Sequence, residues 1–335
     1  MRPLNPKYRN TSRIFDDKKP LDLSPTYLSG LHYHRLPTRQ AGTPDLRPHL
    51  HGVAPLNYSS IVDFLSSPNV IYHNIVFAIG LTAGSFLNVV VYRLPLMLNR
   101  HRPEDRSQLN LCFPASHCTK CKHPLRFWQN VPLFSWLLLR GRCHYCHVKI
   151  PLAYPLSELA CALLFLCMSL LFDAPFTLLS ALILMWFLLA LSLIDSSTYL
   201  LPDMLTLPLM WLGLLTHSVA GEVTLHDSLY GAVAGYLALW GLYWGYRILR
   251  DKEGMGYGDF KLLAALGAWV GWQSLPYLCI LAALIGLSFT LVRVMVRKTT
   301  NEIPFGPCLA LAGGVVYISQ ESNVFWLMFF SLTEV

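Results

Sequence analysis

The chain contains few charged residues for its length. Only 13% of its 335 residues are Asp, Glu, Lys or Arg, about half of the ~25% that is usual in soluble proteins. In contrast, 54% of the residues are hydrophobic and the mean hydropathy is +0.42. Several apolar runs approach or exceed the ~18–20 residues that cross a bilayer. We therefore expect an all-α polytopic membrane protein in contact with the lipid bilayer.

The sequence also lacks the motifs of several common enzyme classes. It has no HExxH zinc-protease motif, no P-loop, and no Ser/His/Asp arrangement in its apolar part. Gly254, Gly256 and Gly258 do not follow a strand pattern, so a dinucleotide-binding fold is not supported. The net charge is +7, but residues 1–58 alone contribute nine Lys/Arg against four Asp. The charge is therefore local, and we expect no nucleic-acid partner.

The basic segment 1–58 is polar, contains proline and has few aliphatic clusters. This composition predicts a disordered N-terminal extension. No signal-peptide pattern occurs in it. One interpretation is a mis-assigned start, with the true start near Val53 or Leu56.

The rest of the chain contains eight apolar segments, each a candidate transmembrane helix. They cover residues 74–92, 154–172, 176–194, 204–219, 228–247, 260–272, 275–294 and 306–331. We expect a first transmembrane helix (74–94), a polar loop domain (95–151) and a seven-helix membrane core (152–331). The sixth segment is short for a full span, so it should tilt or be partly buried among the other helices.

Loop charge predicts how these segments are oriented. Loops 95–151, 248–258 and 295–304 are rich in Lys/Arg or flanked by them, whereas 220–227 has two carboxylates and no Lys or Arg. The positive-inside rule places the basic loops in the cytoplasm and both chain ends outside. The basic N-terminal extension would then have to be exported, which is a second reason to interpret residues 1–58 as the product of a mis-assigned start. By the same count, loop 195–203 is cytoplasmic.

Two carboxylates, Asp195 and Asp259, should consequently lie at similar depth on one membrane face. Like charges in a low-dielectric setting share one proton, so such a pair can act as acid and base on a carbonyl. Gly256 and Gly258 allow a close approach of the backbone before Asp259. The alternative is that each aspartate starts or caps a helix and stays hydrated.

Three further polar residues flank these segments. Asp203 follows Pro202 and precedes the fourth apolar segment, a position that favours helix capping, with lining of the site as the alternative. Lys261 follows Asp259 closely, and we expect it to support the site. Glu158, at the edge of the second segment, could pair with a loop arginine or line the site.

Four cysteines form two CxxC pairs, Cys118/Cys121 and Cys143/Cys146, separated by 21 residues. This spacing predicts a tetrahedral structural zinc site without an open position for water. Disulfides or free thiols are the alternatives, and disulfides are disfavoured because the loop is predicted to be cytoplasmic. Possible substitute ligands are Cys112, His117, His123, His144 and His147, which we expect instead to be solvent-exposed or to surround the site.

Together, seven stretches resemble the type IV prepilin peptidase family, which comprises prepilin leader peptidase/N-methyltransferases and belongs to the GxGD aspartic proteases. They occur in order through about residues 74–310: Gly84-Ser-Phe-Leu-Asn88 with Tyr92-Arg-Leu-Pro95; the two CxxC pairs; Asn130-Val-Pro132 with Leu139-Arg-Gly-Arg-Cys143; Tyr154-Pro-Leu-Ser-Glu158; Ile194-Asp195 with Leu201-Pro-Asp-Met-Leu-Thr-Leu-Pro208; Glu253-Gly-Met-Gly-Tyr-Gly-Asp-Phe-Lys261; and Ile303-Pro-Phe-Gly-Pro307.

The resemblance implies catalytic roles for Asp195 and Asp259 and a zinc-binding role for the four cysteines. The implied activity is removal of the basic leader from type IV prepilins or type II secretion pseudopilins, after Gly and usually before Phe. It implies the cytoplasmic face of the bacterial inner membrane, followed by N-methylation with S-adenosylmethionine. The chain departs from the family at Gln129, where an acidic residue is common.

The sequence assigns no residues to the methyl donor. A non-enzymatic alternative is an inactive membrane scaffold whose zinc loop docks pilus or secretion assembly proteins. A third hypothesis is a related GxGD protease that acts on archaellin-like substrates, although the zinc loop is typical of the bacterial prepilin enzymes. The substrate set and the oligomeric state are not predicted.

Overall fold

The structure is a computed structural model, and its described residues belong to one compact unit, Leu56–Val335. The described ranges are 68–98, 110–219, 223–250, 256–297 and 304–322. The predicted extension, residues 1–58, lies outside them, and so does Gly254 of the glycine-rich motif.

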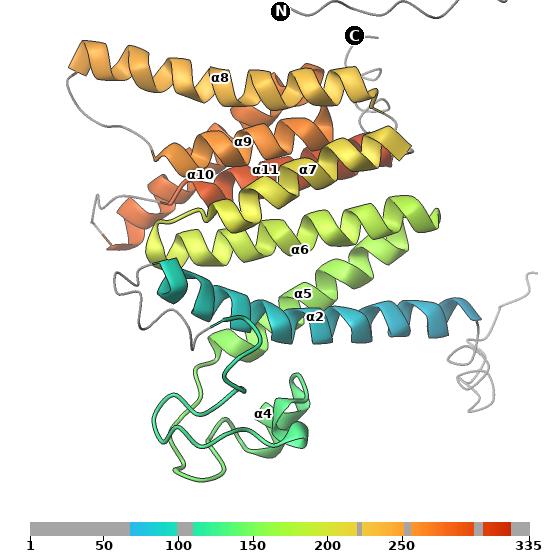
Figure 1. The fold of residues 1–335 in the computed structure, drawn as a ribbon, viewed down its shortest axis with the longest axis vertical. Coiled ribbons are helices and arrows are strands. Elements are labelled where there is room, and N and C mark those ends of the chain that lie inside the picture. Colours follow the sequence, from blue (N-terminus) through green and yellow to red (C-terminus); the bar gives the residue numbers. More distant parts are fainter. Residues whose placement is uncertain (1–67, 99–109, 220–222, 251–255, 298–303, 323–335) are drawn as a thin grey trace, which may run out of the picture. The chain divides into compact units, whose positions relative to one another are not determined.

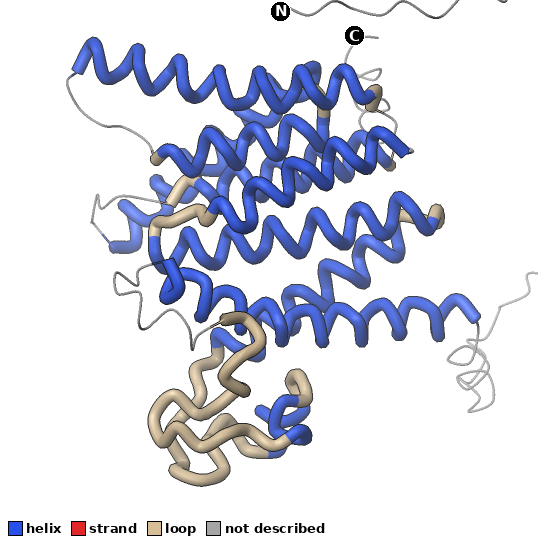
Figure 2. Tube along the Cα trace, in the orientation of Figure 1, coloured by secondary structure: helices blue, strands red, loops and turns tan. Residues whose placement is uncertain are grey.

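The described residues form helices and loops and contain no strand (Figure 2), which confirms the all-α prediction. Each of the eight predicted apolar segments contains one helix (Figure 1). These helices are α2 (Pro68–Leu98), α5 (Ala153–Leu171), α6 (Pro175–Thr198), α7 (Asp203–Val219), α8 (Leu225–Arg250), α9 (Tyr257–Val270), α10 (Leu275–Arg297) and α11 (Gly306–Glu321). Shorter helices are η1 (Phe127–Asn130), α4 (Phe134–Leu138) and η2 (Trp272–Ser274).

Four of the described helices are long and apolar enough to cross a membrane: Asn69–Leu98, Ala153–Leu171, Pro175–Thr198 and Trp272–Val296. The chain is therefore a membrane protein. Helices α7, α9 and α11 have 17, 14 and 16 described residues, fewer than the ~18–20 that span a bilayer. The count of eight spans accordingly stays a prediction.

Local sequence explains where the helices that carry the two aspartates begin and end. Helix α6 starts at Pro175, whose fixed φ suits the first helical turn. It ends where Tyr199 adopts a left-handed conformation with φ 55°. Helix α9 begins after Gly256 and stops at Gly271, which has φ 74° and so breaks the helix. Asp195 is thus in the last turn of α6, and Asp259 is in the first turn of α9.

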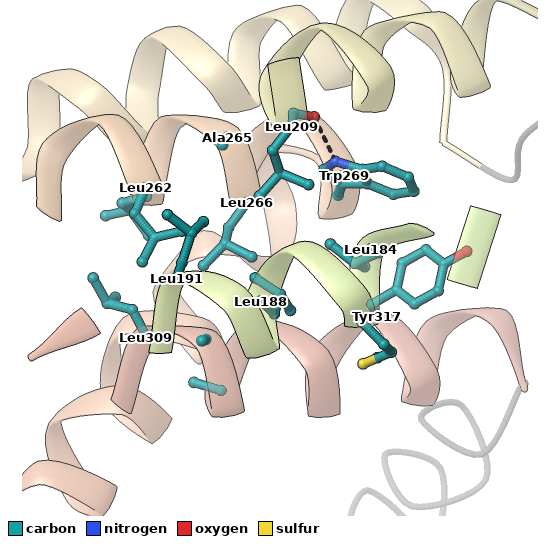
Figure 3. Packing of buried hydrophobic residues seen from close by; sticks show 14 of the residues in the cluster. Leu184, Leu188, Leu191, Leu209, Leu262, Ala265, Leu266, Trp269, Leu309 and Tyr317 are labelled. Atoms are coloured by element: carbon teal, nitrogen blue, oxygen red, sulfur yellow. Dashed lines mark hydrogen bonds between the residues drawn. The ribbon is translucent and has the colours of Figure 1, made fainter. Parts of the chain in front are cut away.

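Helix α9 lies in the middle of the helical core and packs against α7, α8 and α11. Eleven of its 14 residues are buried, so the expectation that this short segment is buried among other helices is confirmed. Its Trp269 donates a hydrogen bond of 2.8 Å from Nε1 to the Leu209 carbonyl and contacts Tyr317 edge-to-face (Figure 3). These contacts fix α9 to α7 and α11.

Helices α8 and α9 approach so closely that their backbones touch at two glycines. A Cβ atom on Gly231 would overlap the carbonyl of Gly267, and a Cβ on Gly267 would overlap the carbonyl of Gly231. Small residues at such positions let membrane helices pack backbone to backbone.

We expect Gly231→Ala to lower the free energy of unfolding by about 1–3 kcal/mol, because overpacking of a tight contact forces the helices apart. Unfolding in detergent, followed by circular dichroism, measures this loss. Gly241→Ala on the same helix is the matched control, since a Cβ there meets nothing within 4 Å. Equal stability of the two variants would contradict the close packing.

The helix ends beside the predicted cytoplasmic loops gather on one side of the helical core (Figure 1). On this side lie the C-terminal ends of α2, α6, α8 and α10, together with the N-terminal ends of α7, α9 and α11. Asp195 and Asp259 are both located at this side, because each sits within one turn of such an end.

Candidate active site and metal centre

The two aspartates that sequence singled out are both buried. Asp195 is 5% exposed and Asp259 is 9% exposed. Asp259 lies within electrostatic reach of Asp195, and Cys308 of α11 lies within reach of both. Helix α11 packs against α6 and α9. Three separate helices therefore bring two carboxyl groups together in a shielded setting, where ionisation of both at once is costly.

The start of α11 holds Asp195 in place. The Gly306 backbone N–H donates a hydrogen bond of 2.9 Å to Asp195 Oδ2. A Cβ atom at position 306 would lie 2.6 Å from the same oxygen, so a side chain there would displace the carboxylate. The sequence contained a signal, the Pro-Phe-Gly-Pro run at 304–307, but periodicity alone could not assign it a partner.

The glycine before Asp259 has a comparable packing role. A Cβ on Gly258 would lie 2.7 Å from the Cβ of Leu201, in the connection between α6 and α7. The absence of a side chain lets the first turn of α9 approach this connection, as the sequence predicted. Gly256 has an ordinary φ of −77°, and nothing in the structure requires glycine there.

Asp203 and Lys261 form an ion pair, the only one found among the described residues. Lys261 Nζ donates to both carboxylate oxygens of Asp203, at 2.7 and 2.8 Å. Asp203 is in the first turn of α7, while the Pro202 carbonyl accepts the first helical bond, from Thr206. The favoured capping role of Asp203 is therefore replaced by a bridge between α7 and α9, because Lys261 extends across to it.

This bridge lies at the surface, with the side chains of Lys261 and Asp203 33% and 55% exposed. Exposed ion pairs contribute little stability, typically about 0–1 kcal/mol. The pair thus orients the beginnings of α7 and α9 beside the buried aspartates without adding much to stability.

The four predicted ligand cysteines form one cluster. Their Sγ atoms all lie within 4.8 Å of one another, and those of Cys118 and Cys146 are 3.8 Å apart. Two of the possible substitutes make other contacts: the His123 ring contacts Tyr145, and His117 Nδ1 bonds to a backbone carbonyl. The cluster could hold a metal ion.

The two CxxC turns have the same backbone geometry. In the first, Cys118 N–H donates to the His123 carbonyl; in the second, Cys143 N–H donates to the Val148 carbonyl. Lys122 and His147, each four residues after the first cysteine, both have positive φ, 59° and 53°. Isolated bridges, 117 with 124 and 142 with 149, close both turns. Each of the two equivalent turns thus contributes two cysteine sulfurs to the same four-cysteine cluster.

The electrostatics of the thiols suit a cation. Burial raises the pKa of Cys118, but hydrogen bonds from the backbone of Cys121 and Lys120 outweigh it and lower the pKa to about 6. A backbone hydrogen bond from His123 lowers the pKa of Cys121, but desolvation and the other thiols outweigh it and raise the pKa to about 11. One thiolate therefore forms readily, while full ionisation of the cluster needs a positive ion.

Glu158 belongs to a different part of the molecule from the aspartate pair. Its Oε2 accepts a hydrogen bond of 2.9 Å from the Leu133 N–H. No ion pair to a loop arginine is found for it among the described residues. It lines a cavity between α2, α5 and residues 110–152, hereafter the cysteine-rich segment. Asp195 and Asp259 do not line this cavity.

Fold and site together define a helical membrane protein with a four-cysteine cluster and two buried, interacting carboxyl groups. Two family models match it: "Bacterial Peptidase A24 N-terminal domain" over residues 78–172 and "Type IV leader peptidase family" over residues 182–291. The chain belongs to the type IV leader peptidase family.

Curated relatives extend this match over most of the chain. It is 46% identical to the prepilin leader peptidase/N-methyltransferase of Aeromonas salmonicida over 274 residues, 77% of this chain and 94% of the relative. It is 49% identical to the protein of that name from Pectobacterium carotovorum, over 73% of this chain and 92% of the relative. It is 44% identical to the protein of that name from Pseudomonas aeruginosa, over 77% of this chain and 94% of the relative. No solved structure matches significantly.

Proposed function

We propose that the chain is a membrane-embedded aspartic endopeptidase that removes the leader of prepilins and N-methylates the new N-terminus with S-adenosylmethionine. Its relatives are named prepilin leader peptidase/N-methyltransferase. The observation that carries the proteolytic half is the burial of Asp195 and Asp259 within electrostatic reach of each other. The aspartate roles are part of the proposal.

In the proposed reaction the two aspartates share one proton. The ionised carboxylate takes a proton from water, and the protonated partner donates to the oxygen of the scissile carbonyl. A carboxylate that accepts a backbone N–H bond is favoured in its ionised form. Gly306 donates to Asp195 and the Gly256 backbone bonds to Asp259, so either aspartate can take the role of base while the other acts as acid.

We place the reaction at the cytoplasmic face of the bacterial inner membrane. Both aspartates lie at the side of the helical core where the helix ends flanking Lys/Arg-rich loops gather (Figure 1). The positive-inside rule assigns that side to the cytoplasm. Prepilins and pseudopilins whose leaders are cut there, after Gly and before Phe, are the proposed substrates, serving pili or type II secretion.

The metal proposed for the four-cysteine cluster is zinc. Tetrahedral Zn–S bonds of ~2.3 Å place ligand sulfurs about 3.8 Å apart, which fits the 3.8 Å between Cys118 and Cys146. Four thiolates complete the coordination sphere, so zinc would stabilise the cysteine-rich segment and would activate no water.

The substitution Gly306→Ala should slow leader cleavage about 10- to 100-fold, because its Cβ would push Asp195 out of its productive position. Cleavage of a purified prepilin, followed by the mobility shift of the product, measures this loss. Gly286→Ala is a suitable control, since a Cβ there meets only ordinary contacts of 3.7 Å or more. An unimpaired Gly306→Ala enzyme would remove the role of Gly306 as a positioning residue.

The proposal as a whole is tested by incubating the purified protein with a prepilin and labelled S-adenosylmethionine. Leader removal and label on the new N-terminus are read separately. We expect both products. A protein that yields neither, under conditions where a relative processes the same prepilin, would overturn the proposal.

A further inference from the structure

A cavity beside Glu158 has no role in the proposed proteolysis. Its volume is about 570 Å³, within the ~300–1,000 Å³ typical of small-molecule sites. The C-terminal half of α2, the start of α5 and the cysteine-rich segment all contribute to its walls. A ligand the size of a nucleoside with a short side chain would fit this volume.

The cavity contains one carboxylate without a cationic partner. Among the described residues, Glu158 has no Lys, Arg or His nitrogen within ion-pair distance. Its hydrogen bonds come from neutral groups: the Leu133 N–H and the side chains of Ser85 and Asn88. A partly buried carboxylate in this state is stabilised by a positively charged ligand. The end of the cavity at Glu158 therefore favours a cationic group, whereas Arg93, Lys122 and Lys149 line other parts of its wall.

Gln129 supplies a second, independent indication of a ligand. Its side chain lines the cavity and is 6% exposed. Oε1 accepts a 2.9 Å bond from the Arg126 N–H, whereas Nε2 has no partner among the described residues. A buried amide donor without an acceptor costs about 1–3 kcal/mol. An acceptor atom on a bound molecule would remove this cost.

The walls around these two groups are held by hydrogen bonds. Asn88 of α2 donates to the Tyr154 carbonyl and accepts from the Ser157 hydroxyl, which ties α2 to α5. Arg93 donates to three backbone carbonyls in residues 110–114, which ties α2 to the cysteine-rich segment. Tyr92 and Trp136 add aromatic surface. The cavity is thus formed before a ligand arrives, with flat apolar surface suited to a nucleobase.

We propose that this cavity binds the methyl donor, with Glu158 facing the positively charged end of S-adenosylmethionine and Gln129 Nε2 donating to one of its acceptor atoms. This inference rests on the proposed function, whose methyl donor it locates. S-adenosylmethionine combines the required features: a nucleoside, acceptor atoms and a sulfonium cation. The methyl donor and the aspartate pair then occupy separate sites, because neither Asp195 nor Asp259 lines the cavity.

Equilibrium dialysis of labelled S-adenosylmethionine against the purified, zinc-loaded full chain tests the assignment without any prepilin. We expect Glu158→Gln to weaken binding about tenfold or more, since it removes the charge but keeps the size and the acceptor for Leu133. Gln129→Met, which removes the unpartnered donor at similar volume, should weaken binding about threefold to tenfold. Asp173→Asn, at an exposed carboxylate in the turn between α5 and α6, should leave binding unchanged.

Zinc content and melting temperature show whether each variant is folded. Unchanged affinity in a folded Glu158→Gln protein would overturn the site, even if the wild-type protein binds and methylates normally. Wild-type protein that cleaves prepilin but neither binds nor uses S-adenosylmethionine would instead refute the methylation part of the proposed function. The two failures are therefore distinguishable.

Discussion

Replacing Asp195 or Asp259 with asparagine should lower the rate of prepilin cleavage by about 10²–10⁴-fold or more, the contribution of a general acid or base. Asparagine has nearly the same shape and can accept the Gly306 N–H bond, but it can neither take nor supply the proton. The measurement is the single-turnover cleavage rate of a purified prepilin in detergent micelles.

The control for this experiment is Asp173→Asn. Asp173 precedes α6, at the opposite end of that helix from Asp195, and its side chain is exposed. The Asp173→Asn variant should cleave prepilin at the wild-type rate. Full processing by Asp259→Asn would instead favour the scaffold hypothesis, in which the aspartates only begin or end helices.

Substituting Cys118 with serine should remove the bound metal and disorder the cysteine-rich segment. Structural zinc in small domains contributes about 10–16 kcal/mol of apparent binding free energy, which becomes folding free energy of the domain. We expect one zinc per wild-type chain by elemental analysis and a stoichiometry below about one tenth in the variant. Cys112→Ser, an exposed cysteine outside the cluster, should retain the metal.

Loss of zinc should affect the proposed methyl-donor cavity more strongly than the site of Asp195 and Asp259. Cys118 and Cys143 line the proposed methyl-donor cavity, so binding of S-adenosylmethionine should be lost. Asp195, Asp259 and Gly306 lie on α6, α9 and α11, so cleavage should fall less. Rapid and complete loss of cleavage on mild chelation of a still-folded protein would argue for metal catalysis instead.

Short-range sequence patterns predicted much of this molecule. The CxxC spacing identified four cysteines that the structure gathers in one cluster, because each turn is determined by only a few residues. Apolar runs located the eight long helices of the described residues, and the short sixth run indicated a helix buried among the others. Loop charge predicted that Asp195 and Asp259 lie on one side of the membrane, although it could not predict the distance between their carboxyl groups.

Contacts between distant residues were beyond the sequence. The bond from Gly306 to Asp195 joins positions 111 residues apart, and no periodicity encodes such a pairing. Asp203 was expected to cap a helix because local geometry favoured it, but Lys261, 58 residues later, bonds to it. In the sequence, Gln129 stood out only as a departure from the family. That its Nε2 is buried and has no hydrogen-bond partner among the described residues depends on the folded structure around it.

The central claim is that Asp195 and Asp259 act as one catalytic unit, and the double variant Asp195→Asn/Asp259→Asn tests it most directly. Residues that act as a unit show strongly non-additive losses. We predict that the double variant cleaves prepilin no more slowly than either single variant, since one substitution already disables the shared proton. Losses that multiply, or single variants that retain wild-type rates, would contradict the account.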